Sequence, residues 1–118
     1  MSIDPNKNKE CPFCNILLND SKKQIIKQWP NFTAIRKLYD SKNVNFLIIS
    51  NHHTPNLNDP NANVDLNELT MCAKELANGN DWSIKINNGP KSGQDVFHIH
   101  AHIASYDDVR LWKSLARN

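Results

Sequence analysis

Hydrophobic and polar residues alternate with a period of two in several segments, and this period is typical of β-strands. Segment 24–38 holds two such runs around a Pro-Asn pair, which predicts a β-hairpin. Segment 43–50 contains the apolar run FLII and is apolar enough to be a central strand. Further strands are expected at 82–88 and 95–105, joined by a tight connection over 89–93. The pattern therefore predicts a sheet with five strands.

One segment has helical spacing instead. Its apolar positions recur with a period near 3.6 residues: Leu66, Leu69, Cys72, Ala73 and Leu76. Asp65 is a suitable N-cap and Gly79 follows the expected end. Segment 52–64, rich in Asn and Pro, reads as a loop before this helix. We expect the helix to pack on the sheet in an α+β fold, with Cys72 as an apolar filler.

The length of the chain fits one domain over residues 1–118. Its 39% hydrophobic and 22% charged residues are typical of a globular protein. Residues 1–9 are polar and are expected to form a loose N-terminal segment. Residues 105–118 form a C-terminal tail that includes the amphipathic stretch DDVRLWKSLARN.

Charge and apolar runs argue against two classes of partner. The formal net charge is only +2, and the Lys and Arg residues are scattered, so nucleic acid is not an expected partner. The run FLII is far too short to span a bilayer, and the N-terminus has no apolar signal core. We therefore expect a cytoplasmic protein without a membrane partner. The odd number of cysteines, three, favours reduced thiols in a metal or catalytic role.

Three histidines stand at every second position of the last predicted strand. His98, His100 and His102 should point to one face, each about 7 Å from the next. The residues between and beside them should point to the other face and pack under the helix: Phe97, Ile99, Ala101 and Ile103. A solvated polar face is the simpler explanation for one histidine. Three in five residues favour a functional site.

The CPFC tetrad has two incompatible interpretations. Cys11 and Cys14 are either a redox dithiol or half of a metal site. A redox dithiol should follow a strand and begin a helix, but no strand is predicted before residue 11, although NILLND allows a short helix. Ordinary buried thiols are a third interpretation, so the residues alone leave the question open.

The segment NNGPKSGQDVFHIHAHIA, Asn87 to Ala104, resembles the signature of the histidine triad (HIT) family of nucleotide hydrolases and transferases. The resemblance extends back through NFLIISNHH to CPFC, and covers most of residues 11–104. It implies the HIT fold, a five-stranded antiparallel sheet with one main helix. It also implies a homodimer formed across that helix and an edge strand.

The resemblance implies roles for the histidines and the turn before them. His100 is implied as the nucleophile, and His102 as a phosphate ligand or an aid to the leaving group. The remaining residues implied near the phosphate or ribose are the flanking His98 and Asn87, the backbone N–H of Gly93, the side chain of Gln94, and Asp95. The implied activity is cleavage of a nucleoside 5′-phosphoramidate, or a related purine nucleotide conjugate, through a nucleotidyl-histidine. No metal is expected in the chemical step.

Other activities stay open. Dinucleoside polyphosphate hydrolysis is the nearer alternative. A nucleotide-binding module with little turnover and a CPFC dithiol oxidoreductase are hypotheses from other classes.

The resemblance also implies a metal site and a base pocket. A structural zinc would be held by Cys11, Cys14, His53 and His98, with His53 matching the family position better than His52. The positions that correspond to a base pocket are Phe13, Ile16, Ile35 and Leu38, and a plain core role is the alternative for them.

Several residues depart from the family pattern. Asp95 stands where a small hydroxyl residue is usual, and its charge would repel a phosphate if it pointed inward; strand alternation predicts that it points away from the histidines. Lys37 stands where an acid or amide usually binds the ribose. Asn45 and Ser50 replace a more common His and Pro.

Overall fold

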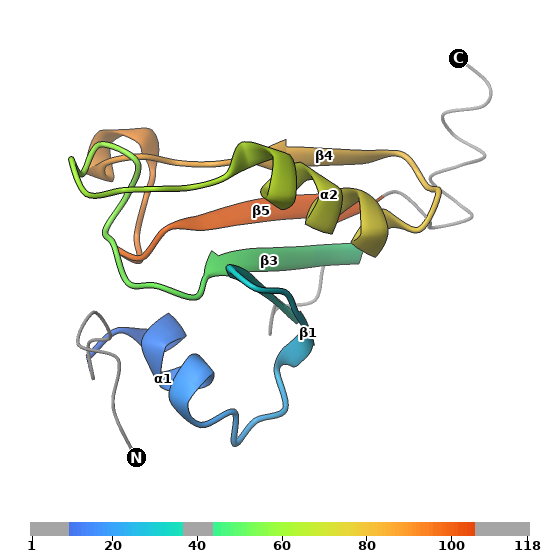
Figure 1. Cartoon of the computed structure of the whole chain (residues 1–118), viewed down its shortest axis with the longest axis horizontal. Coiled ribbons are helices and arrows are strands. Elements are labelled where there is room, and N and C mark those ends of the chain that lie inside the picture. The colour runs from blue at the N-terminus through green and yellow to red at the C-terminus, as the bar shows by residue number, and fades with distance from the viewer. Residues whose placement is uncertain (1–9, 37–43, 106–118) are drawn as a thin grey trace.

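The computed structural model describes residues 10–36 and 44–105. Five strands form one antiparallel sheet in the order β1-β2-β3-β5-β4 (Figure 1). The strands are β1 (Ile25–Gln28), β2 (Phe32–Arg36), β3 (Val44–Ser50), β4 (Trp82–Lys85) and β5 (His100–Ser105). The helices are α1 (Pro12–Leu18), α2 (Leu66–Ala77) and the 3-10 turn η1 (Pro90–Ser92). The predicted hairpin, the central position of β3 and the α+β fold are confirmed.

The main helix, α2, begins and ends close to the predicted residues. The Asp65 carboxylate accepts hydrogen bonds from the backbone N–H groups of Asn67 and Glu68 at 2.9 and 3.2 Å, so Asp65 is the N-cap. Asn78 adopts the left-handed conformation at the C-terminus with φ of 51°, directly before Gly79.

The apolar side of α2 covers one face of the sheet (Figure 1). The buried residues of this layer are Phe32, Ala34, Ile48, Leu69, Cys72, Ala73, Ala101 and Ile103. Burial, with the carboxylates of Glu68 and Glu75 nearby, raises the pKa of the Cys72 thiol to about 11. Cys72 is therefore a neutral apolar filler, as predicted.

The short helix α1 packs on the opposite face of the sheet. A second buried cluster joins it to β2 and β3 and consists of Cys11, Phe13, Cys14, Ile35 and Ile49. The helix begins where Cys11 Sγ accepts a hydrogen bond from the Cys14 N–H at 3.4 Å, and Pro12 occupies the first helical position. The sequence allowed a short helix over NILLND, residues 15–20, but α1 already begins at Pro12. Proline at the first helical position and the Cys11 cap favour this earlier start.

The last strand is shorter than predicted. Strand alternation suggested residues 95–105, but β5 begins at His100. Before that point the backbone bonds to a loop, since the Ile99 N–H donates to the Thr54 carbonyl at 2.9 Å and the Ser50 N–H donates to the Ile99 carbonyl at 3.1 Å. Phe97 is 46% exposed and does not pack under α2, which corrects that part of the prediction, whereas Ala101 and Ile103 do. Similarly, β4 ends at Lys85 rather than residue 88.

Some predictions concern residues outside the described ranges. The loose segment 1–9, the tail from 106 onward, Lys37 and Leu38 lie outside the described residues. Within residues 10–36 and 44–105, no helix has both the length and the apolar character that crossing a membrane requires.

Candidate functional site

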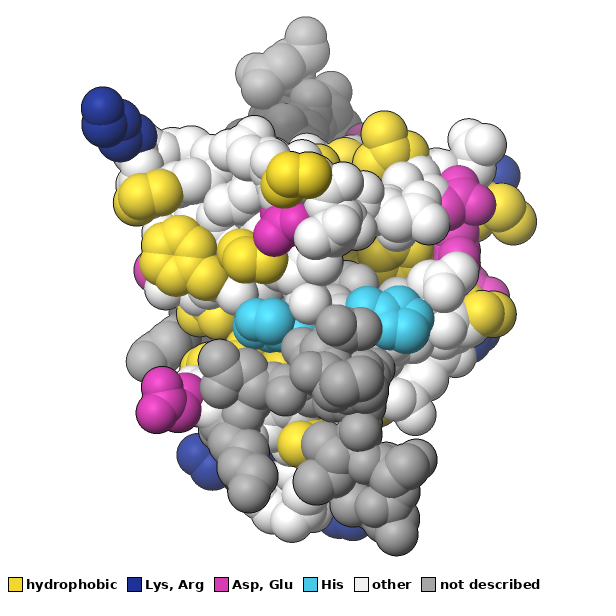
Figure 2. Space-filling view, turned by 60° about the vertical axis from the view of Figure 1, so that its left-hand side comes forward, with side chains coloured by type: hydrophobic (Ala, Val, Ile, Leu, Met, Phe, Trp, Pro, Cys, Tyr) yellow, Lys and Arg dark blue, Asp and Glu magenta, His cyan; other side chains and the backbone are white. Residues whose placement is uncertain are grey.

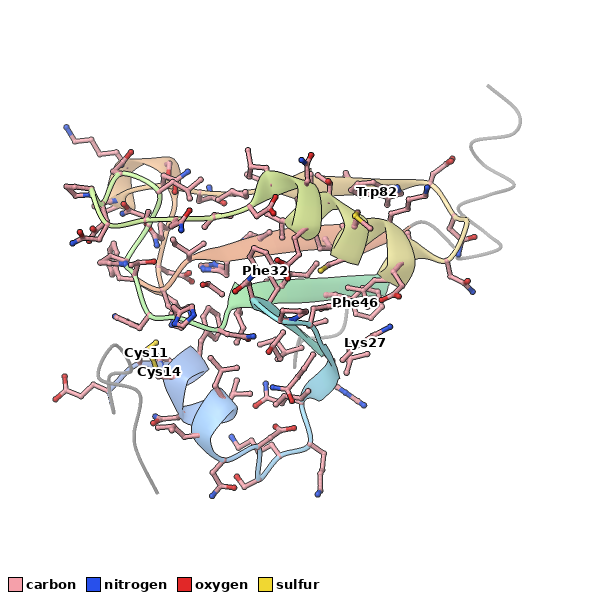
Figure 3. All side chains as sticks on the ribbon, viewed as in Figure 1. Cys11, Cys14, Lys27, Phe32, Phe46 and Trp82 are labelled. Atoms are coloured by element: carbon pink, nitrogen blue, oxygen red, sulfur yellow. The ribbon has the colours of Figure 1, made fainter. Side chains whose placement is uncertain are left out.

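Two cysteines and two histidines converge where α1 begins and β3 ends (Figure 3). Cys14 Sγ lies 3.2 Å from His53 Nδ1 and 3.5 Å from His98 Nδ1. Cys11 Sγ lies 3.3 Å from His98 Nδ1, and the two histidine Nδ1 atoms are 3.1 Å apart. All four ligand atoms lie within 4.8 Å of one another. His53 rather than His52 belongs to this cluster, in agreement with the predicted set.

The donor set fits a tetrahedral zinc ion. Zinc bonds of about 2.3 Å to sulfur and about 2.0–2.1 Å to nitrogen place tetrahedral ligand atoms about 3.3–3.8 Å apart, close to the separations found here. His98 Nε2 lies 2.7 Å from the Ser50 backbone carbonyl, which can only accept, so the ring donates its proton there. In the neutral ring, His98 Nδ1 therefore directs a lone pair at the cluster, as a metal ligand must.

The accessibility of the thiols argues against a redox dithiol. A dithiol oxidoreductase needs an exposed thiolate on Cys11, and this side chain is only 7% exposed. Cys14 is completely buried. The pair does lie at a helix N-terminus, as redox pairs do, but it faces two imidazoles rather than solvent. The arrangement favours metal binding over thiol exchange.

The triad histidines lie on the same side of the sheet as α1. His100 Nδ1 lies 2.7 Å from the His98 backbone carbonyl and donates to it, which leaves the lone pair on Nε2. The His102 ring follows with its centroid 5.1 Å from that of His100. His98 precedes the strand. Its ring therefore reaches the cysteines of the Cys11, Cys14, His53 and His98 group, which we call the cysteine cluster, while its carbonyl orients His100. Figure 2 shows this end of the molecule, where histidine side chains reach the surface beside hydrophobic ones.

The turn before the triad is closed by its own hydrogen bonds. Gly89 and Gly93 have φ of +92° and +98°, a conformation that favours glycine. The Gly93 N–H donates to the Pro90 carbonyl at 3.1 Å, and the Asn87 side-chain amide donates to the Ser92 carbonyl. These groups hold the turn, so a direct contact of Gly93 or Asn87 with an anion stays a prediction.

The Gln94 side chain is fully hydrogen-bonded within the protein, and its predicted contact with an anion stays a prediction. Its Oε1 accepts from the Gly89 N–H at 2.8 Å and from Asn56 Nδ2 at 3.1 Å. Its Nε2 donates to the Pro55 carbonyl at 2.7 Å and the Val96 carbonyl at 3.0 Å. Both lone pairs and both protons of the amide are used, and the side chain is buried. Gln94 is thus a brace between the loop at 55–56 and the turn before the triad.

We expect Gln94→Ala to lower the free energy of unfolding by about 2–4 kcal/mol, because buried groups lose their partners. Urea unfolding followed by circular dichroism measures this change. The matched control is Gln28→Ala, since Gln28 is exposed and its amide makes one hydrogen bond, to Thr33 Oγ1 at 3.4 Å. Equal losses in the two variants would contradict a bracing role for Gln94.

The remaining predicted residues take different positions. Ile35 is fully buried in the layer beneath α1, and Ile16 packs partly buried against it. This placement supports a core role, and their contact with a base stays a prediction. Asp95 is exposed and precedes β5, so strand alternation does not determine its direction.

Two features of the site were not predicted from the sequence. The Ser50 backbone carbonyl orients the His98 ring, and no side chain marks such a carbonyl in a sequence. A polar hollow of about 520 Å³ also adjoins His53. Its lining includes His52, Thr54, Asn61, Asn63 and Asp65. The many Asn residues of the loop were a signal of polarity but not of a hollow.

Comparisons with known proteins agree with this geometry. The sequence profile of the HIT domain matches residues 19–109, which include all three triad histidines and begin after Cys14. An uncharacterized HIT-like protein of Chlamydia muridarum is 31% identical over 80 residues, 62% of this chain and 63% of that protein. This chain thus matches about 63% of the length of that relative.

Solved structures of similar proteins share the fold. A HIT family hydrolase of Legionella pneumophila is 27% identical with a TM-score of 0.68, covering 79% of this chain and 89% of that one. A zinc-bound histidine triad family protein of Mycobacterium smegmatis is 26% identical with a TM-score of 0.70, covering 86% of this chain and 79% of that one.

Proposed function

This chain belongs to the HIT domain family, and we propose that it is a nucleotide hydrolase or transferase that uses His100 as its nucleophile. The substrate class is a nucleoside 5′-phosphoramidate or a related purine nucleotide conjugate. The observation that carries the proposal is the 2.7 Å hydrogen bond from His100 Nδ1 to the His98 carbonyl. That bond leaves Nε2 as the neutral, nucleophilic atom of the ring.

The proposed reaction has two displacement steps. His100 Nε2 attacks the phosphorus, forming a P–N bond to the ring while the bond to the leaving amine breaks. His102 lies next to His100 on the strand and gives the departing amine a proton. Water then attacks the phosphorus of the nucleotidyl-histidine, so that a P–O bond forms as the P–N bond to His100 breaks. A proton from the water returns to His102, and the nucleoside monophosphate is released. Within this scheme His98 holds His100 through its backbone.

Zinc at Cys11, Cys14, His53 and His98 forms the second part of the proposal. The ion would supply structural anchoring of the segment before α1 to the chain before β5. The distances among the four ligand atoms and the donation from His98 Nε2 to Ser50 support it. The histidine triad protein of Mycobacterium smegmatis, with zinc bound, supports the same interpretation.

A homodimer across α2 and an edge strand stays a prediction. Leu66 and Met71 are large apolar side chains exposed on α2, and Met71 is 70% exposed. Such residues support an interface on this helix. The cytoplasmic location likewise stays a prediction.

The test is an assay of the purified protein with adenosine 5′-phosphoramidate, in which AMP release is followed over time. A parallel reaction contains a dinucleoside triphosphate, and mass spectrometry of base-quenched samples searches for a nucleotidyl adduct on the peptide with His100. We expect faster release from the phosphoramidate and an adduct on that peptide. A higher kcat/KM with the dinucleotide would favour the polyphosphate hydrolase. Nucleotide binding by a folded protein without turnover or adduct would overturn the hydrolase proposal in favour of a binding module.

A further inference from the structure

The chain contains two Asn-Gly pairs, and they lie at opposite ends of β4 (Figure 1). Asn78–Gly79 joins the end of α2 to β4, and Asn88–Gly89 leads from β4 into η1. Asparagine followed by glycine is prone to deamidation, because glycine has no Cβ that would hinder its backbone nitrogen. The structure gives the two glycine nitrogens different surroundings.

Deamidation requires the glycine nitrogen and the asparagine side chain to meet. The glycine N–H loses its proton to hydroxide, and the nitrogen attacks Cγ of the asparagine. A C–N bond forms, the bond from Cγ to the amide nitrogen breaks, and ammonia leaves with a proton taken from water. Water then opens the resulting succinimide at either carbonyl, which gives aspartate or isoaspartate. The reaction therefore needs a free glycine N–H and a side chain that can turn toward it.

The Asn88–Gly89 pair meets neither requirement. The Gly89 N–H donates to Gln94 Oε1 at 2.8 Å, and Asn88 Oδ1 accepts from the Leu57 N–H at 2.9 Å. Both residues of the pair are half-buried. Attack on the side chain would require a local opening that breaks both hydrogen bonds at once. The Gln94 brace therefore protects the turn before the triad from this reaction.

The Asn78–Gly79 pair meets both requirements. Both residues are exposed, and the side-chain position of Gly79 has no neighbouring atom within 4 Å. The Asn78 backbone N–H ends α2 by donating to the Lys74 and Glu75 carbonyls, at 3.2 Å each. In the described part of the chain, however, neither the Gly79 N–H nor the Asn78 side chain has a hydrogen-bond partner. The nitrogen and the amide are both open to the reaction.

We propose that Asn78 is a deamidation site of the folded protein, whereas Asn88 is protected by the fold. The product places a negative charge at the C-terminus of α2, where the helix dipole is already negative. In the isoaspartate form it also adds one carbon to the backbone between α2 and β4. The turn before the triad keeps its amide, so the modification acts on the end of α2 and leaves the proposed active site unchanged.

The test incubates the full-length protein at mildly alkaline pH, in native buffer and in guanidinium chloride. Trypsin separates the two sites, because Asn78 falls in peptide 75–85 and Asn88 in peptide 86–91. Mass spectrometry with fragmentation measures the conversion of amide to acid at each asparagine, and a zero-time sample corrects for the digestion. Labelling with an isoaspartyl methyltransferase detects the isoaspartate product.

Two controls separate the effect of the fold from other causes. Asn58 is an exposed asparagine in the same molecule, but it is followed by Asp59 rather than glycine. The variant Asn78→Gly removes the site and suits the left-handed conformation at this position, where φ is 51°. Its circular dichroism spectrum is compared with that of the wild type.

In native buffer we expect Asn78 to deamidate at least about tenfold faster than Asn88, because the hydrogen bonds at Asn88 must first break. In guanidinium chloride the two rates should agree within about threefold, since the protecting contacts are lost. Asn58 should stay unmodified over the same time, and Asn78→Gly should give no isoaspartate in native buffer.

Three results would overturn the proposal. The first is an Asn78 that stays intact in native buffer while it deamidates in guanidinium chloride. The second is equal deamidation of Asn78 and Asn88 in native buffer, because the fold would then protect neither site. The third is a difference between the two sites that persists unchanged in guanidinium chloride, because the neighbouring sequence rather than the structure would then be its cause.

Discussion

Replacement of His100 by alanine is expected to reduce AMP release from adenosine 5′-phosphoramidate by about 10,000-fold or more. The variant removes the one protein atom that, in the proposed scheme, bonds to phosphorus, and losses of this size accompany removal of a covalent nucleophile. Because His100 Nδ1 donates to the His98 carbonyl, the variant also removes that hydrogen bond. Initial rates of AMP release by wild type and variant, at equal protein concentration, measure the effect.

The matched control is His52→Ala. His52 is an exposed histidine that stays outside the cysteine cluster and the triad, so its loss should change the rate by less than about twofold. Circular dichroism spectra of both variants, compared with that of the wild type, serve as the check that they are folded. A His100→Ala protein that keeps a tenth or more of wild-type turnover would exclude His100 as the covalent nucleophile.

The strands and the main helix were predictable because their burial follows a simple period. The FLII run of β3 contributes to both buried layers, with Ile48 in one and Ile49 in the other, and α2 combines its apolar stripe with the Asp65 cap. The exact start of β5 was not predictable from the same signal. Alternation of polar and apolar residues continues from 95 to 105, but the Ile99 N–H bonds to Thr54 and not to a strand.

The candidate site was predictable for the residues that belong to a recognisable sequence motif. The triad and the four cluster residues were predicted by resemblance, and the structure brings the cluster ligands together. Gln94 shows the limit of this reasoning. Two of its four hydrogen bonds join it to a loop at 55–56 that lies 38 or more residues away in the chain, and no spacing in the sequence indicates that proximity.

Phe13 shows a second limit. An apolar residue between two cysteines is consistent with a pocket wall and with a core position, and the sequence left both open. Its edge-on ring contacts with His98 and His100 appear only after α1 is docked against the chain before β5. Packing of a short helix depends on its partners more than on its own propensity.

Removal of the Cys14 thiol is expected to abolish zinc binding and to lower the melting temperature by about 15 °C. Free zinc at about 1,000 times its dissociation constant stabilises the folded state by about 4 kcal/mol. For a domain of this size about 1 kcal/mol corresponds to about 4 °C. Cys14 Sγ lies near both histidine ligand atoms, so Cys14→Ala leaves the cluster with one sulfur and two nitrogens. Zinc per chain, by a colorimetric chelator assay after dialysis, and thermal unfolding give the two readouts.

Cys72→Ala is the control, because Cys72 is equally buried but lies in the α2 layer, away from the cluster. It should cost about 1 kcal/mol and keep one zinc per chain, since only packing is lost. A chelator should lower the melting temperature of the wild type and of Cys72→Ala, and leave that of Cys14→Ala unchanged. Zinc retained by Cys14→Ala would contradict the assignment of the ligands. A wild type that binds no zinc, together with loss of activity in Cys11→Ser, would instead favour dithiol chemistry, because the sulfur atoms would then act without a metal between them.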